Sequence, residues 1–223
     1  MKTKVIVIGG KGGAVVVGEQ IYDAQMKGAN VEFLGYAFDD ESFGTEINGF
    51  PIVAKTKEVY SKFKDDEDVK FIFQLYRPDL MNERIDLLKS YHIPEDRFYT
   101  FIHPSCVVSP SAKIGVGVAI MANSVVNSNV VIGNHCTIHS NSLIGHDTKM
   151  GNYNFVAAHN VIGSNNNIGR ANFLGLNSTF NNYLNIGDNC FVGMASNVIK
   201  SIPDNVKVYG NPAKPFTSKI KAL

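Results

Sequence analysis

The sequence predicts a small α/β domain with a parallel sheet, followed by a parallel β-helix. In the first hundred residues, continuous apolar runs of strand length alternate with helical stretches, which is typical of a parallel sheet flanked by helices. In the remainder, one apolar residue recurs at every sixth position through sixteen consecutive repeats: Val108, Ile114, Ile120, Val126, Ile132, Ile138, Ile144, Met150, Val156, Ile162, Ile168, Leu174, Phe180, Ile186, Val192 and Val198.

A period of six matches neither the 3.6-residue period of a helix nor the 2-residue period of a flat strand. It fits a solenoid whose coil has three flat sides, with one inward-pointing anchor residue on each side. Such hexapeptide repeats are the signature of a parallel β-helix. Eighteen residues then form one coil, and residues 104–201 form about five coils.

The positions beside the anchors support the same register. Glycine often follows the anchor directly, and we expect these glycines to adopt positive φ at the corners. The residue two before the anchor is usually small, which suits a narrow interior. All three cysteines, Cys106, Cys136 and Cys190, fall there. They are therefore interpreted as core thiols rather than as a disulfide, a zinc site or a nucleophile.

In the first hundred residues we expect strands over 4–8, 31–36, 49–53 and 69–75, and helices up to about residue 28 and over 55–64 and 79–91, with 97–102 extended. The first strand ends in the glycine loop 9–13, whose backbone N–H groups, with the next helix N-terminus, suit a phosphate. A purely structural turn is the alternative. The loop is not G-x-G-x-x-G, so NAD is not expected. A nucleotide diphosphate would contact the loop and Asp39 or Asp40.

Composition excludes several classes of protein. The net charge of +1 argues against a general nucleic-acid binder, and no apolar run has transmembrane length, so we expect a cytoplasmic protein without a membrane span. Residues 101–223 carry only three acids, Asp147, Asp188 and Asp204. This mildly basic half suits an anionic ligand.

One pair of residues in the repeat suggests chemistry. Asp147 directly follows His146, and a neutral imidazole oriented by a carboxylate is suited to general-base catalysis at neutral pH. The other histidines of the repeat are His135, His139 and His159. One coil from His146 lie serines rather than further histidines, so no stacked zinc site is expected.

The chain resembles the bacterial hexapeptide-repeat sugar O-/N-acyltransferases, which include sialic acid O-acetyltransferases and N-acetyltransferases of nucleotide-linked amino sugars. The resemblance covers nearly the whole chain. It rests on the His-Asp step at His146, on Gly-Asn-Pro-Ala-Lys at 210–214, and on 5–13, 33–40, 102–105, 141–147 and 187–204. It implies a Rossmann-like nucleotide- or sugar-binding domain over 1–102, a left-handed β-helix with a short tail over 103–223, and a homotrimer with sites between subunits.

The resemblance also implies site residues. His146 would be the base, Asp147 would orient it, and a backbone N–H near Gly163 and Ser164 would hold the carbonyl oxygen of acetyl-CoA. Pantetheine would pass Leu176 and Met194, with Lys214 near a CoA phosphate. The substrate-binding residues would be Gly10, Lys11, Gly12, Gly13, Asp39, Asp40, Tyr76, Arg77 and His139.

Several positions depart from the family pattern. Phe155 replaces a family histidine associated with acetyl-CoA, and His159 is a candidate substitute. His139 stands where the family has asparagine. The glycine loop reads Gly-Gly-Ala at 12–14 instead of Gly-His-Gly. Leu-Tyr-Arg at 75–77 replaces a Gly-Asp/Asn-Asn loop, so Arg77 would grip a phosphate and Tyr76 would stack on a base.

The predicted function is acetyl-CoA-dependent N-acetylation of a nucleotide-linked amino sugar, in surface polysaccharide or glycan synthesis, without a metal. O-acetylation of a sugar such as sialic acid is the alternative within the class. A non-catalytic trimeric binding or scaffold protein is the alternative from another class. A sugar-nucleotide pyrophosphorylase would require a much larger first domain. The sequence does not identify the sugar, its nucleotide or the acyl group.

Overall fold

The computed structural model describes residues 2–216. Its N-terminal half contains a five-stranded sheet of order β3-β4-β2-β1-β5, in which all neighbours are parallel except β3 and β4. The strands are β1 (Thr3–Ile8), β2 (Val31–Ala37), β3 (Glu46–Ile47), β4 (Phe50–Ala54) and β5 (Val69–Phe73). The sheet is flanked by α1 (Gly13–Met26), α2 (Val59–Phe63) and α3 (Met81–Ser90), with 3₁₀ turns η1 (Glu41–Phe43) and η2 (Glu95–Arg97).

The predicted parallel sheet is confirmed, with shifts at the element ends. Helix α2 starts at Val59, four residues later than expected, and Arg97 belongs to η2 rather than to an extended segment. The buried Arg97 guanidinium donates to carbonyls near the end of α2, among them those of Phe63 and Lys64. These bonds hold Arg97 in the η2 turn.

The sheet has a topological switch point between β1 and β5. From β1 the chain goes to β2 and β4 on one side, and then crosses to β5 on the other. Ligands of open parallel sheets bind outside the carboxyl ends of the strands at such a point. The glycine loop after β1 lies at this edge.

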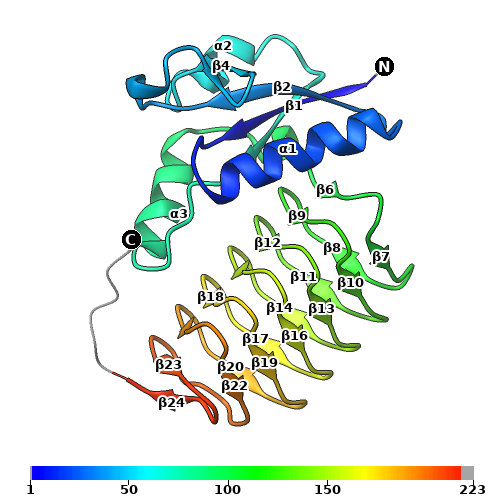
Figure 1. The fold of residues 1–223 in the computed structure, drawn as a ribbon, viewed down its shortest axis with the longest axis vertical. Coiled ribbons are helices and arrows are strands. Elements are labelled where there is room, and N and C mark those ends of the chain that lie inside the picture. The colour runs from blue at the N-terminus through cyan, green and yellow to red at the C-terminus, as the bar shows by residue number, and fades with distance from the viewer. Residues whose placement is uncertain (1, 217–223) are drawn as a thin grey trace.

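Residues 101–209 form a solenoid of short parallel strands arranged on three faces (Figure 1). The first face contains β6 (Phe101–Ile102), β9 (Ala119–Ile120), β12 (Thr137–Ile138), β15 (Phe155–Val156), β18 (Phe173–Leu174), β21 (Phe191–Val192), β23 (Lys207–Tyr209) and the antiparallel β24 (Lys214–Pro215). The second contains β7 (Val107–Val108), β10 (Val125–Val126), β13 (Leu143–Ile144), β16 (Val161–Ile162), β19 (Thr179–Phe180) and β22 (Asn197–Val198). The third contains β8 (Lys113–Ile114), β11 (Val131–Ile132), β14 (Lys149–Met150), β17 (Asn167–Ile168) and β20 (Asn185–Ile186).

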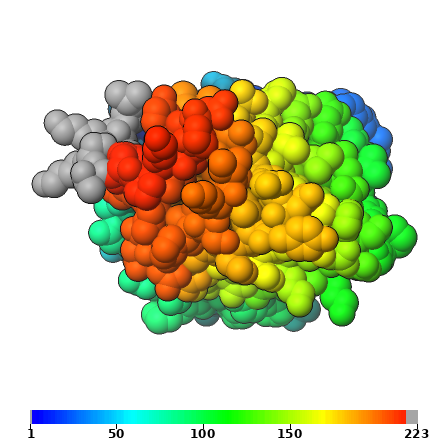
Figure 2. All heavy atoms as spheres, turned by 90° about the horizontal axis from the view of Figure 1, so that it is seen from below, coloured from blue at the N-terminus to red at the C-terminus, as the bar shows by residue number. Residues whose placement is uncertain are grey.

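The register confirms the predicted coil length. Leu143 pairs with Val125 on one side and with Val161 on the other, eighteen residues away in each direction. The many short parallel strands are consistent with a left-handed β-helix. The apolar anchors fill one continuous core. Figure 2 looks onto the C-terminal end of the solenoid, where the last coils, coloured orange to red, reach the surface.

The position two before each anchor faces the interior, as predicted, and it is buried from Val118 onward. Four consecutive repeats place asparagine there rather than a small residue: Asn154, Asn160, Asn166 and Asn172. The Nδ2 of Asn160, for example, donates to Ala157 O in its own coil at 2.7 Å and to Gly175 O in the next coil at 2.9 Å. The amides of Asn154 and Asn166 make the same pair of bonds, so that three of the four asparagines tie two coils together through Nδ2.

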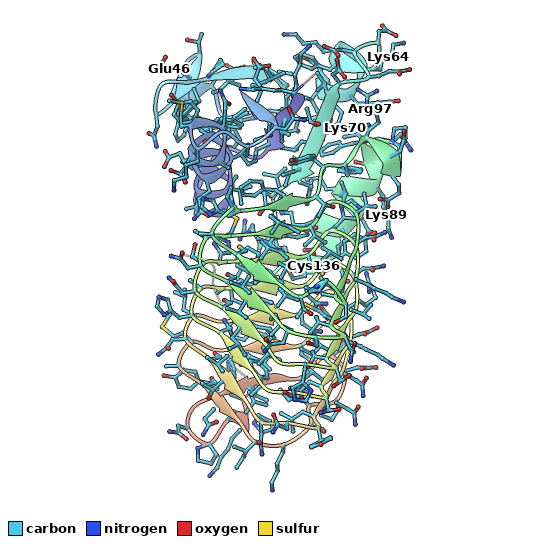
Figure 3. The ribbon with its side chains drawn as sticks, turned by 90° about the vertical axis from the view of Figure 1, so that its right-hand side faces the viewer. Glu46, Lys64, Lys70, Lys89, Arg97 and Cys136 are labelled. Atoms are coloured by element: carbon cyan, nitrogen blue, oxygen red, sulfur yellow. The ribbon has the colours of Figure 1, made fainter. Side chains whose placement is uncertain are left out.

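The cysteines behave as predicted, because all three are free thiols. Cys136 is fully buried inside the solenoid (Figure 3), and Cys190 is also buried, whereas Cys106 is partly exposed. Burial raises the pKa of the Cys136 thiol to about 12 and raises that of Cys106 and Cys190 as well. Thiols with raised pKa values are poor nucleophiles.

The prediction for the corner glycines was wrong. Positive φ falls three residues after the anchor, where asparagine is the commonest residue, for example Asn141 and Asn165 at 60° and 58°. A glycine directly after an anchor is required instead by the neighbouring coil. A Cβ on Gly145 would lie 2.5 Å from Gly163 C, and one on Gly175 would lie 2.6 Å from Val192 O. Close stacking of coils, rather than backbone conformation, selects these glycines.

An apolar cluster joins the two halves. Ala119 and Met121 on the first face are fully buried and pack in the same cluster as Ile21 of α1. Gln74 Nε2 donates to Thr137 Oγ1 at 2.8 Å across the same seam. Strand β6 already pairs with β9, so the solenoid begins at Phe101. Within residues 2–216, no helix combines the length and the apolar character needed to cross a membrane.

Candidate active site

His146 and Asp147 lie at the corner between the second and third faces, after β13 and before β14. We call this corner, with His146, Asp147, Asn129, Ser164 and Asn182, the dyad corner. His146 Nδ1 and Asp147 Oδ2 are 2.7 Å apart. Asp147 has a φ of 58°, the left-handed conformation that Asp and Asn tolerate best. The corner geometry therefore turns two sequence neighbours into a hydrogen-bonded pair.

The pair has the electrostatic arrangement of a general base. The pKa of Asp147 lies below its usual value, first because of the hydrogen bond with His146 and second because Asn129 Nδ2 donates to Asp147 Oδ1 at 2.9 Å. Asp147 is therefore a carboxylate at neutral pH, and it fixes the proton of His146 on Nδ1. Nε2 makes no hydrogen bond within residues 2–216, and the His146 side chain is 56% exposed. Its lone pair faces solvent, where a substrate can reach it.

The backbone donors predicted one coil further on are already in use. Gly163 N–H donates to Phe180 O at 3.0 Å in the regular coil-to-coil ladder. Ser164 N–H donates to Asn182 Oδ1 at 2.7 Å. Because exposed Asn182 can rotate whereas the Gly163 bond is part of the fold, only Ser164 can become an oxyanion donor. Sequence reasoning missed Asn182 and Asn129, although the eighteen-residue spacing points to both.

The glycine loop does not lie near the dyad in this chain. It meets the first face instead, where a Cβ on Gly13 would lie 3.5 Å from His139 Nε2 and 3.9 Å from the Phe155 ring. Gly10 packs so tightly on Phe38 that a Cβ would lie 2.4 Å from its ring. Gly12 has a φ of 53° and precedes α1 without a side-chain cap. The N–H groups of Ala14 and Val15 donate to Lys11 O and Gly12 O at 3.2 and 3.1 Å, so within residues 2–216 the Gly13 N–H is the one in the first turn of α1 that is left for a ligand.

His139 is enclosed between the loop and Phe155. The two rings are 4.9 Å apart, and His139 Nε2 is buried without a hydrogen-bond partner in the described part of the chain. Burial lowers the pKa of His139 to about 4. The imidazole is consequently neutral at physiological pH.

Lys11, Asp39 and Asp40 line one cavity at the carboxyl ends of the strands. Its volume is about 490 Å³. Lys11 Nζ pairs with Asp40 Oδ2 at 2.6 Å, and Lys11 followed by Ser42 holds the pKa of Asp40 at about 2. Asp39 accepts hydrogen bonds from the backbone and the hydroxyl of Thr56. We call this the α/β pocket.

Tyr76 and Arg77, predicted to bind the base and a phosphate, make internal contacts instead. Tyr76 Oη donates to His135 O at 2.8 Å, and burial holds the Tyr76 pKa well above its usual value. Arg77 forms a two-pronged ion pair with Asp79, at 3.1 and 2.9 Å. Neither side chain lines the α/β pocket.

Of the predicted cofactor residues, Gly163 and Ser164 belong to the dyad corner, whereas Leu176 and Met194 lie at a different corner. Leu176 and Met194 are 50% and 61% exposed at successive coils of the corner between the first and second faces. His159 lies at the same corner, with Nε2 3.4 Å from Asn141 Nδ2. Phe155 lies on the first face at the head of a stack with Phe173 and Phe191.

Lys214 lies in β24, where it pairs with Tyr209, and it is exposed. In the part of the chain that the structure describes, no three His, Cys, Asp or Glu side chains are grouped closely enough to hold a metal ion.

Comparisons with known proteins place these features in context. The family model of the GMPPB C-terminal domain matches residues 102–207, which is the solenoid alone. No curated protein matches the chain by sequence.

Solved structures match both halves. PerB from Caulobacter crescentus, solved with CoA and GDP-perosamine, has 26% identity and a TM-score of 0.80, over 96% of this chain and 97% of that chain. The acetyltransferase domain of PglB from Neisseria gonorrhoeae FA1090 has 24% identity and a TM-score of 0.78, over 96% and 100%. WeeI from Acinetobacter baumannii AYE has 22% identity and a TM-score of 0.65, over 96% and 100%. The last two show likeness of fold, whereas PerB is also similar in sequence. A mutant of perosamine N-acetyltransferase from Caulobacter crescentus, solved with CoA and GDP-perosamine, has 25% identity and a TM-score of 0.81. Solved structures that cover both halves of this chain are acetyltransferases, PerB with CoA among them, and the chain is accordingly an acyltransferase.

Proposed function

We propose that the protein is an acetyl-CoA-dependent N-acetyltransferase of a nucleotide-linked amino sugar, acting in surface polysaccharide or glycan synthesis in the cytoplasm. The observation that carries this proposal is the His146–Asp147 dyad, with Nδ1 held by the carboxylate and Nε2 open to solvent. PerB, bound to CoA and GDP-perosamine in its solved structure, supports the same class of reaction.

In the proposed reaction, acetyl-CoA supplies the acetyl group. His146 Nε2 accepts a proton from the sugar amine as its nitrogen bonds to the thioester carbon. Asp147 stabilises the imidazolium that forms. His146 then returns the proton to the departing sulfur, so that the C–S bond breaks and the products are an amide and free CoA thiol. Ser164 N–H would hold the carbonyl oxygen once Asn182 turns away.

We propose that residues 1–102 serve as a Rossmann-like domain for the nucleotide and residues 103–223 as a left-handed β-helix for acyl transfer. The α/β pocket supports the first part, since its volume is about 490 Å³ and it adjoins the uncapped N-terminus of α1. Lys11, Gly12 and Gly13 would meet the diphosphate. This pocket favours a nucleotide-linked amine over the alternative, O-acetylation of a free sugar such as sialic acid.

We propose a homotrimer with its sites between subunits. The dyad corner and the corner with Leu176 and Met194 are separated by the second face, so one chain does not bring base and cofactor residues together. Pairing the dyad corner of one subunit with the other corner of the next would do so. Exposed apolar side chains at successive coils suit a pantetheine chain, and exposed Lys214 suits a CoA phosphate.

The test is release of free thiol from acetyl-CoA, screened over UDP-, dTDP- and GDP-linked amino sugars and over sialic acid. We expect release with at least one nucleotide-linked amine and none with sialic acid. Release only with a hydroxyl acceptor would establish O-acetylation. No release with any acceptor would favour a binding or scaffold protein. Because the proposed steps need no metal, EDTA should leave the rate unchanged, and zinc-restored activity would contradict the mechanism.

A further inference from the structure

The α/β pocket contains more polar chemistry than the sequence motifs account for. The apolar side chains of Phe38, Leu75 and Leu87 line it, together with Arg84 of α3 and Tyr91 just after that helix. Apolar walls beside a few polar groups are typical of a site for a flat heterocycle.

Two of these polar groups lack partners. Arg84 Nε and Tyr91 Oη are both buried, and neither makes a hydrogen bond to any residue between 2 and 216. Tyr91 is only 7% exposed. Only six buried side-chain atoms in that range are unpaired, and two of the six line this one cavity. A buried polar group without a hydrogen-bond partner is destabilising, so both atoms favour a ligand that pairs them.

The ionisation state of both groups follows from their surroundings. Burial raises the pKa of Tyr91, an effect that nearby Thr56 opposes without reversing. The hydroxyl of Thr56 is itself engaged by Asp39 at 2.6 Å. Tyr91 therefore stays a neutral hydroxyl that can donate or accept. Arg84 can only donate, because a guanidinium has no acceptor.

The groups suited to a phosphate and the unpaired groups come from different sides of the pocket. Lys11 and Asp40, whose side chains are 60% and 34% exposed, line the part of the pocket next to the glycine loop and the N-terminus of α1, which suits a phosphate. Arg84 and Tyr91 come from α3, which follows β5 on the other side of the switch point. A nucleotide with its diphosphate at the loop would therefore direct its base toward Arg84 and Tyr91.

We propose that Arg84 and Tyr91 select the nucleotide by the edge of its base, accepting uracil, thymine or guanine and rejecting cytosine or adenine. This inference rests on the proposed nucleotide-linked substrate. Uracil, thymine and guanine each present a carbonyl oxygen beside a ring N–H. Arg84 Nε–H donates to the carbonyl, and the ring N–H donates to Tyr91 Oη. Cytosine and adenine have an amino group in place of this carbonyl. The amino N–H and Arg84 Nε–H are both donors, so they would face each other without forming a hydrogen bond.

The experiment measures binding of UDP, dTDP, GDP, CDP and ADP to the full-length protein by calorimetry, without acetyl-CoA. We expect the first three to bind at least about tenfold more tightly than CDP and ADP, since each unpaired donor costs one hydrogen bond. Arg84→Met and Tyr91→Phe should each weaken the tight ligands about tenfold and change CDP and ADP little, which removes the preference.

Lys89→Met is the matched control, because Lys89 is an exposed cation on the outer side of the same helix (Figure 3). It should bind like the unaltered protein, and far-UV circular dichroism should show all variants folded. Equal weakening of all five nucleotides by Arg84→Met would mean a phosphate contact and overturn the inference. Binding without base preference would also overturn it while leaving the proposed function intact, whereas no binding of any nucleotide would overturn both.

Discussion

The dyad corner and the α/β pocket differ in what each lacks. The dyad corner has an aligned base at the surface, with the His146 side chain 56% exposed. The α/β pocket has about 490 Å³ of space and two unpaired polar atoms, and the histidine that meets the adjoining glycine loop, His139, is half-buried and neutral. One region thus offers a base at the surface, and the other offers a cavity that His139 does not line.

Under the proposed function, a single chain does not contain a complete site. Transfer needs the amine, the thioester and the base within a few ångströms of one another. Here the glycine loop meets the first face, whereas the dyad lies at the junction of the second and third faces. Association of subunits is the simplest way to join the two regions.

The largest expected effect is loss of the base. His146→Ala should lower kcat by roughly a thousandfold, within the range that general-base catalysis contributes, with little change in the KM for acetyl-CoA. The exposed side chain makes no packing contribution that would alter the melting temperature. Undiminished thiol release in this variant would remove His146 from its assigned role.

The next effect tests the separation of the two regions directly. His146→Ala and Lys11→Glu should each be inactive alone. Co-expressed in one cell, they should recover roughly a quarter of full activity, because in a random cyclic oligomer that fraction of sites pairs an intact dyad with an intact loop. Purified mixed oligomers would be assayed for thiol release. No recovery at all would mean that both regions serve the same site within one chain.

A smaller effect is expected when the dyad keeps its base but loses its anion. Asp147→Asn should reduce kcat by about tenfold to a hundredfold, because Nδ1 is no longer held as a donor and the imidazolium loses its counter-charge. Asn is the commonest residue at these corners, so folding should be unaffected. Circular dichroism and steady-state kinetics check both points. A rate equal to that of the unaltered enzyme would show that the carboxylate does not act on His146.

The smallest effect concerns stability at the seam. His139 has its pKa lowered from 6.5 to about 4 by burial. Between pH 6.5 and pH 4, His139 is protonated in the unfolded chain but stays neutral in the folded chain. The free energy of unfolding is therefore highest above pH 6.5 and falls as the pH is lowered, by at most about 1.4 kcal/mol per pH unit. His139→Gln should flatten this loss in urea unfolding between pH 7 and pH 5. Parallel curves for the two proteins would mean that His139 is solvated.

The fold was largely predictable because period six is a geometric property of the chain. Leu143 pairs with Val125 and Val161, each eighteen residues away, and the same spacing assigns every other strand to its face of the solenoid. The error concerned the glycines after the anchors. Their role depends on how close the next coil's backbone comes, as at Gly145, and this distance is not encoded in a single repeat.

The site was predictable only in part, and for a related reason. His146 and Asp147 are neighbours in the sequence, so their contact could be anticipated. Tyr76 and Arg77 were assigned by residue type, but local geometry commits them to His135 and Asp79. Arg84 belongs to no sequence motif. That its Nε is buried without a partner depends on how α3 packs against the sheet, which the sequence does not show.

The positive-φ position at each corner has an evolutionary consequence. Seven of these positions within residues 2–216 hold asparagine along the solenoid: Asn123, Asn129, Asn141, Asn165, Asn177, Asn189 and Asn205. At Asp147 an aspartate takes the same conformation, a side chain that differs from asparagine by replacing an amide with a carboxylate. Any such corner therefore stands one substitution from an oriented carboxylate and, with a histidine before it, two from a dyad. The solenoid offers many places where a base can arise without disturbing the fold.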